Sequence, residues 1–235
     1  MRICHGTSSI HLDSILREGL KPRGQKPSNW QASSHADLVY LSQAYALHYA
    51  GNAADKEGGD ILLVEIDTDL LPASSSMLAD EDAILSALSM GIIERPSFAN
   101  YDPDLALHDV AELITADLDK FAEIGADAEW SLSVIGNCTH HGVIPPDAIT
   151  RIVSYSAEAN WWIGFNDPVI AIPNFRYLGG EFTKTQLCLM GRKDEAEPIP
   201  TMFPMTFSLN DLDDHIRGMK KEEWHRVNGR LIEVY

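Results

Sequence analysis

Short apolar runs and amphipathic segments alternate along the first quarter of the chain. Residues 2–4 (RIC) predict a short strand, and His5 follows at its end. Residues 8–19 then carry apolar side chains at helical spacing, with serines in front and a glycine behind, which predicts a capped helix. The polar stretch 21–36, rich in Gly, Pro and Ser, predicts a loop.

The same alternation continues to residue 71. Residues 37–42 (DLVYLS) predict a second strand, and Ser42 is placed to cap an alanine-rich helix over 43–55. The segment 59–71 contains ILLVEI, the clearest strand of the chain. Because nearly all its residues are aliphatic, we expect it to be buried on both faces.

The pattern changes after residue 73 and indicates an α+β fold with a split, two-sheet core. Residues 74–129 predict an acidic helical insertion, and residues 130–156 (from WSLSV to IVSYS) return to strands. The end of the chain predicts an acidic helical tail finishing in LIEVY. We therefore expect a core over 1–155 and a C-terminal extension over 156–235 that packs on it, either as a second unit or within one domain.

Composition narrows the functional classes. The formal net charge of -17 disfavours non-specific binding to nucleic acid, because phosphate backbones are repelled. Three scattered cysteines lack metal-site or disulfide spacing, which is typical of a reducing, cytoplasmic protein. No run of 18 apolar residues and no secretory signal is present, so we expect no membrane association. His140 and His141 point to opposite sides of a strand, and we expect no metal.

Three groups of residues stand in a suggestive order: His5-Gly6-Thr7, then Tyr40 within VYLS, then Tyr49 in the following helix. This order, with the intervening helix, resembles the ADP-ribosyltransferase family in its diphtheria-toxin and poly-ADP-ribose-polymerase branch. The resemblance covers residues 3–70 and, more loosely, 137–155. It implies a mono-ADP-ribosyltransferase that uses NAD as substrate and a protein or nucleic-acid acceptor.

The resemblance assigns a role to each motif. Two tyrosine rings, Tyr40 and Tyr49, would stack on the nicotinamide, whose positive charge suits their π-faces. Gly6 would let the carboxamide approach the backbone, and His5 would hold the ribose. Tyr45, four residues before Tyr49, is the rival for the second ring. The residues expected to bind NAD are His5, Gly6, Thr7, Tyr40, Ser42 and Tyr49.

The chain departs from the family at the glutamate. The corresponding position, before the IPP turn, falls near Asn137 or Thr139, and neither is acidic. A carboxylate is favoured beside the ribose cation that forms in the reaction. We expect Glu129, predicted to begin a strand, to supply it alongside His5 and Tyr49. The other candidates are Asp80, Glu81, Asp82 and Glu181.

Three other functions are compatible with the same residues. An empty glutamate position is also typical of an inactive binding module of this fold. The acidic surface alternatively suggests an interaction protein that recruits a basic partner. An RNA 2′-phosphotransferase shares the HGT start, but it needs several arginines, and Arg2, Arg17 and Arg23 are the only ones in the first third.

Overall fold

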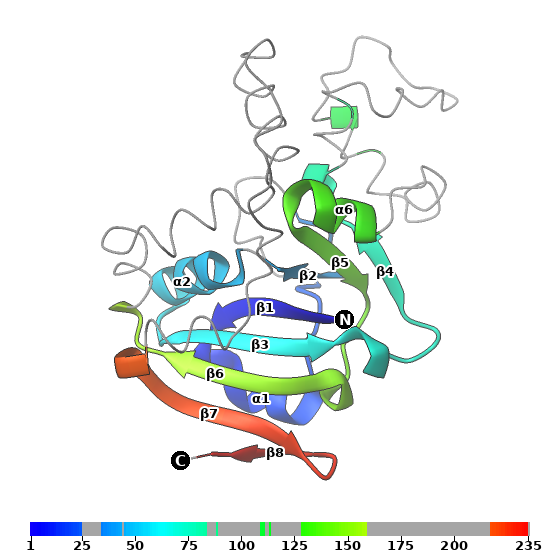
Figure 1. Cartoon of the computed structure of the whole chain (residues 1–235). Coiled ribbons are helices and arrows are strands. Elements are labelled where there is room, and N and C mark those ends of the chain that lie inside the picture. Colours follow the sequence, from blue (N-terminus) through cyan, green and yellow to red (C-terminus); the bar gives the residue numbers. More distant parts are fainter. Residues whose placement is uncertain are drawn as a thin grey trace, which may run out of the picture.

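The core of the protein is one antiparallel sheet of eight strands (Figure 1). The computed structural model describes residues 1–24, 34–43, 45–83, 88, 109–110, 113, 128–158 and 217–234. The strand order is β4-β5-β2-β1-β3-β6-β7-β8. The strands are β1 (Arg2–Ser8), β2 (Leu38–Ser42), β3 (Ile61–Asp67), β4 (Ser76–Ala79), β5 (Asn137–His141), β6 (Ile149–Tyr155), β7 (Lys220–Val227) and β8 (Arg230–Glu233).

Two helices cover opposite faces of this sheet. Helix α1 (Leu12–Glu18) packs with one apolar cluster, and helix α2 (Ala46–Glu57) packs with the other. A third helix, α6 (Ala128–Ile135), contacts β4 and β5. Single 3-10 turns lie at Ser9–His11, Thr68–Leu70, Pro146–Ala148 and Arg217–Met219. The described elements therefore confirm an α+β protein.

The local signals at the first helix and at β3 behave as the sequence predicts. The Ser8 hydroxyl accepts the Ile10 amide, and Gly19 ends α1 with a φ of 76°, a conformation that favours glycine. Strand β3 is buried on both faces, since Leu63 belongs to the α2-side cluster and Leu62 to the α1-side cluster. Alternate residues of one aliphatic strand thus serve two cores.

A seam divides the sheet between β1 and β2. Strand β1 pairs with β3 through all seven of its residues, but it pairs with β2 only at Cys4 and Ser42. The expected split into two sheets is therefore replaced by one sheet with a weak join. Three strands (β4, β5, β2) lie on one side of the seam and five on the other.

Three sequence predictions about secondary structure are wrong. Strand β1 does not stop before His5 but continues to Ser8, because β3 offers a partner along its whole length. The segment after Glu129 is helix α6, not a strand. Ala128 and Leu132, four residues apart, enter the same core cluster, and this is the spacing of a helix face.

The predicted helical tail is wrong over its last part, which forms the hairpin of β7 and β8. Asn228 and Gly229 both have positive φ angles, 49° and 78°, between the two strands. This is the conformation of a tight hairpin turn. The hairpin adds two strands to the sheet next to β6.

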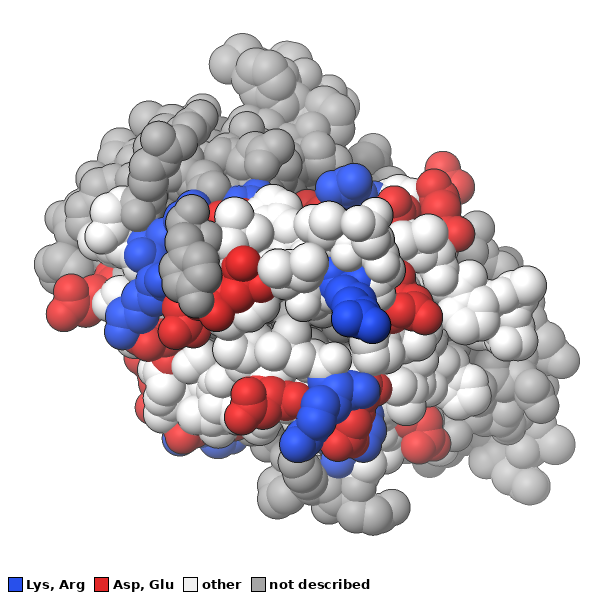
Figure 2. Space-filling view, turned by 90° about the horizontal axis from the view of Figure 1, so that it is seen from below, with Lys and Arg blue, Asp and Glu red and all other residues white. Residues whose placement is uncertain are grey.

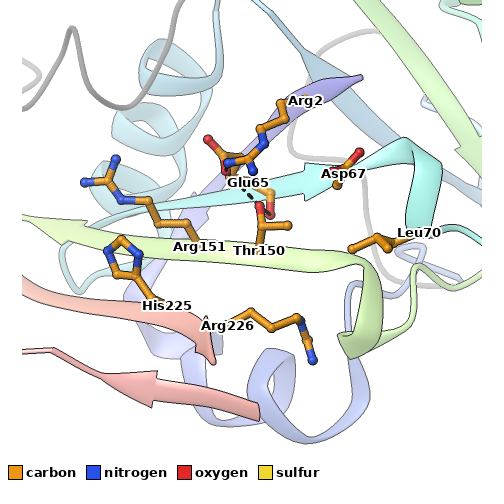
Figure 3. Close-up of a pocket in the computed structure, with 8 residues that line it drawn as sticks. All are labelled: Arg2, Glu65, Asp67, Leu70, Thr150, Arg151, His225 and Arg226. Atoms are coloured by element: carbon orange, nitrogen blue, oxygen red, sulfur yellow. Dashed lines mark hydrogen bonds and ion pairs between the residues drawn. The ribbon is translucent and has the colours of Figure 1, made fainter. Parts of the chain in front are cut away.

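A ladder of charged side chains fastens this hairpin to the sheet. Arg151 on β6 donates from Nε to Glu223 Oε1 at 2.5 Å, and Lys220 Nζ lies 2.8 Å from Oε2 of the same carboxylate. Arg2 and Thr150 both bond Oε1 of Glu65, at 2.8 and 2.7 Å. Side chains of β1, β3, β6 and β7 line an open pocket of about 400 Å³. Figure 3 shows these lining residues.

Glu223 makes this attachment sensitive to pH. Burial alone would raise its pKa, but hydrogen bonds from Lys220, Arg151 and His225 outweigh burial and lower the pKa to about 2. The stabilisation is therefore complete above the ordinary glutamate pKa of 4.5 and is lost as pH falls toward 2.

Glu223→Gln is expected to lower the free energy of unfolding at pH 7 by about 2 kcal/mol, because Arg151 is left buried beside a neutral side chain. The variant and the wild type should converge as pH falls from 4.5 toward 2. Urea denaturation across this range measures both effects. Glu222→Gln, at the exposed neighbouring position, is the control. Equal stability of Glu223→Gln and the control at pH 7 would contradict the assignment.

Candidate functional site

His5 lies at the seam, where the hydrogen bonds between β1 and β2 stop. Its Nδ1 is 2.8 Å from the backbone oxygen of Tyr40 on β2. A carbonyl only accepts, so Nδ1 carries the proton and Nε2 is an acceptor in the neutral ring. Burial lowers the pKa of His5, which keeps the ring neutral at pH 7. No described residue bonds Nε2, which leaves this nitrogen available to a hydroxyl donor.

Gly6 faces helix α2, not open space. A Cβ built on Gly6 would lie 1.8 Å from the backbone oxygen of Ala46 and 2.9 Å from the amide nitrogen of Ala50. The expectation that this residue is small to admit a carboxamide is therefore incomplete, because the helix already requires a glycine here. Since successive side chains alternate, His5 leaves β1 on the opposite face from Gly6.

The Tyr40 hydroxyl is held at the other side of the seam. It donates to Oε1 of Glu81, and the backbone N–H of His35 lies 2.7 Å from the Tyr40 hydroxyl and 3.1 Å from that carboxylate oxygen. Burial and then the neighbouring Glu81 carboxylate raise the pKa of Tyr40, so the phenol stays protonated and remains a donor. Tyr40 is half-buried, as expected for a residue at a rim.

Tyr49 and Asn137 meet on the α2 face of the sheet. Asn137 Nδ2 donates to the Tyr49 hydroxyl at 2.8 Å. Asn137 pairs with Ser42 across β5 and β2, so it lies on the same face as Tyr40, two residues along β2. The Tyr45 ring lies 6.3 Å from the Tyr49 ring at an angle of 52°, so the two candidate rings contact each other.

Asp80 connects these groups at the end of β4. Its backbone N–H donates to the Ser131 hydroxyl at 2.9 Å, and that hydroxyl donates to the backbone oxygen of Asn137 at 2.7 Å. The Asp80 carboxylate accepts the Asp82 amide at 2.9 Å. Burial, then the nearby Glu81 and Asp82, raises the pKa of Asp80 well above its usual range. Buried carboxyls with raised pKa values are common at functional sites.

The remaining predicted residues have different surroundings. Ser42 is buried, and its hydroxyl accepts the Tyr45 amide at 2.7 Å and lies 3.2 Å from the Gly136 carbonyl, so it supports the backbone. Thr7 is half-buried on β1. Glu129 is exposed in the first turn of α6, not at a strand end. Glu181 lies outside the described residues.

The acids that the structure brings to the tyrosines are Asp80 and Glu81, which sequence reasoning ranked behind Glu129. Pairing of β4 with β5 aligns Ala79 with Cys138, which places residue 80 beside residue 137. No local pattern announces this contact. The sequence did contain one indication of a site here, because three consecutive acids, residues 80–82, directly follow the short strand β4.

Comparisons with known proteins assign no family. No protein-family model matches the chain, and no curated protein matches it. Among solved structures, a chain named EcPltA matches with 12% identity and a TM-score of 0.33, over 66% of this chain and 75% of that one. A likeness at this level carries no argument about fold or function.

Two further classes of site can be checked in the described part of the chain. There, no group of three or more His, Cys, Asp or Glu side chains is placed to hold a metal ion. His140 is buried and His141 exposed, in keeping with opposite faces of β5. The helices among the described residues are too short or too polar to cross a bilayer.

Charged side chains on the face seen from below are mixed in sign. Figure 2 shows Lys and Arg interleaved with Asp and Glu on this face. A pocket of the hairpin is likewise mixed in sign, since Lys220 and Lys221 line it together with Glu222 and Glu233. An uninterrupted acidic surface is not seen here, and the recruitment of a basic partner stays a prediction.

Proposed function

We propose that the chain is an NAD-dependent mono-ADP-ribosyltransferase whose substrate lies at the seam between β1 and β2. The observation that carries the proposal is His5, fixed by the Tyr40 carbonyl where the strand ladder stops, with Nε2 left as an acceptor. The resemblance of HGT, VYLS and the later tyrosine to this enzyme family supplies the chemistry. Tyr40, Tyr49 and Asn137 lie beside the same seam on the α2 face, whereas the His5 side chain leaves β1 on the opposite face.

In the proposed reaction, the bond between the nicotinamide nitrogen and ribose C1′ breaks, and nicotinamide leaves with the electron pair. C1′ becomes an oxocarbenium ion, and a lone pair of the acceptor forms the new bond to C1′ while the acceptor loses its proton. His5 would accept a hydrogen bond from a ribose hydroxyl and fix the sugar. The tyrosine ring of residue 49 would stack on the nicotinamide.

The proposal is tested by incubating the purified protein with NAD and measuring free nicotinamide. The wild type should release nicotinamide, and Tyr49→Ala should raise the KM for NAD at least about 10-fold through loss of stacking. Tyr49→Phe should keep the KM within a few fold, although it leaves the Asn137 amide without its partner and lowers stability by about 1 kcal/mol.

Tyr45→Ala is the matched variant, because that ring contacts Tyr49 and is the rival for stacking. A larger rise in KM for Tyr45→Ala would move the stacking role to Tyr45. Equal and severe losses for Tyr49→Ala and Tyr49→Phe would show that the hydroxyl matters more than the ring.

A second candidate is an inactive NAD-binding module. Asn137, an amide at the position where the family has its glutamate, favours this candidate. Titration with NAD separates the two, since the module binds NAD and releases no nicotinamide. Neither binding nor release would leave the interaction protein as the remaining function.

A further inference from the structure

Glu81 is a carboxylate whose Oε1 is oriented by two neighbouring donors. Its Oε1 accepts the Tyr40 hydroxyl and lies 3.1 Å from the His35 N–H, two donors that set the orientation of the side chain. Neither of these two bonds uses Oε2, no other described residue is hydrogen-bonded to it, and the side chain is only half-buried. A carboxylate needed solely to satisfy Tyr40 would be equally served by an amide oxygen.

A second observation points to a ligand beside this carboxylate. Asn137 is 5% exposed, and its Oδ1 is buried with no hydrogen-bond partner. Its Nδ2 is directed at the Tyr49 hydroxyl, and Ser131 joins its backbone to Asp80, the residue before Glu81. Buried acceptors are rarely left unpaired, because the lost hydrogen bond to water costs free energy. Asn137 Oδ1 therefore lacks a donor that a bound molecule would supply.

Asn137 and Glu81 also differ in charge, because only Glu81 carries an ionisable group. Asn137 cannot take a proton, so the amide that occupies the family glutamate position cannot act as a base. Glu81 reaches the same face of the sheet by way of the Tyr40 side chain, from the end of a different strand.

We propose that Glu81 is the catalytic carboxylate of this site and acts as the general base for the acceptor, while Asn137 accepts a hydrogen bond from the bound substrate. This inference rests on the proposed function. As the acceptor lone pair attacks ribose C1′, the acceptor O–H or N–H proton passes to Glu81 Oε2 and then to solvent. With water as acceptor, the products are ADP-ribose, nicotinamide and one proton. Burial raises the pKa of Glu81, which brings a base closer to working pH.

Glu81→Gln tests the assignment because it keeps the Oε1 acceptor for Tyr40 and removes the base. Nicotinamide release from NAD in water should fall 10- to 100-fold, with the NAD dissociation constant unchanged within a few fold. The acid limb of the pH–rate profile should change in the variant, because only the protonation of His5 is then left to lower the rate at acid pH. Glu81→Asp should recover part of the rate, since a carboxylate is restored one methylene short.

Asp37→Asn, at an exposed position just before β2, removes the same charge and should keep the wild-type rate and profile. Thermal unfolding of each variant checks that the fold survives. A wild type that releases nicotinamide together with a Glu81→Gln variant that keeps its rate and acid limb would overturn the role of Glu81 alone. A wild type that releases none would overturn the proposed function and this inference with it.

Discussion

His5→Ala is expected to lower nicotinamide release at least about 100-fold, which corresponds to about 2.7 kcal/mol of transition-state stabilisation. The reason is geometric. The Tyr40 carbonyl uses Nδ1 and fixes the ring, so Nε2 is presented at the seam as an acceptor for a ribose hydroxyl. Alanine removes both the Nε2 acceptor and the Nδ1–H group whose hydrogen bond fixes the ring.

Stability should change much less than activity in this variant. The imidazole makes one hydrogen bond to the backbone, and its loss costs about 1 kcal/mol. His141→Ala, at an exposed position on β5, is the matched control and should keep the wild-type rate. The rate is measured with saturating NAD, beside a thermal unfolding curve for each protein. Near-wild-type release by a folded His5→Ala protein would show that the ribose is held elsewhere.

The pH dependence gives an independent check on the same residue. Because burial lowers the pKa of His5, the neutral ring persists below pH 6.5, and its Nε2 becomes a donor only at still lower pH. If the protonation of His5 limits the reaction, the wild-type rate should fall only below pH 6.5, the ordinary pKa of histidine.

Helix α1 and strand β3 were predictable because their local signals agree with their tertiary partners. Ser8 caps the 3-10 turn that leads into α1, Gly19 ends α1, and the aliphatic run of β3 has apolar partners on both faces. In these segments periodicity, capping and burial all favour the same structure. The sequence alone placed them correctly for this reason.

The errors arise where a tertiary partner or an overlooked turn decides the structure. WSLSV is compatible with either a strand or a helix, and packing of Ala128 and Leu132 selects the helix. Asn228-Gly229 is the strongest short signal for a hairpin and predicts the turn between β7 and β8. The charged residues around it hide the alternation of apolar and polar positions that is typical of strands. Buried Glu223, next to buried Trp224, breaks the simple apolar pattern.

The candidate site was predictable only in part, and through resemblance. His5 and Tyr40 are 35 residues apart, and their order in the chain suggested the pair. Glu81 is 41 residues from Tyr40, and no motif links them. Their contact depends on the pairing of β2 with β5 and of β5 with β4, which sequence periodicity does not determine.

Gly6 is packed more tightly than any side chain would allow. The alanines that helix α2 presents to the core, Ala46, Ala50 and Ala54, recur every four residues and are buried. They let the helix backbone come close to β1, so that a Cβ at residue 6 would lie 1.8 Å from the Ala46 oxygen. The contact is with backbone, which cannot rotate away as a side chain does.

Gly6→Ala is therefore expected to lower the free energy of unfolding by about 3 kcal/mol or more, because α2 must move off the sheet. Gly218→Ala is the control, since no atom lies within 4 Å of its added Cβ, and it should change stability by no more than about 0.5 kcal/mol. Urea denaturation measures both. The double variant Gly6→Ala, Ala46→Gly should not recover stability, because trimming the Ala46 side chain leaves its backbone oxygen in place. A Gly6→Ala protein with wild-type stability and weakened NAD binding would instead show that the missing side chain serves the ligand, not the helix.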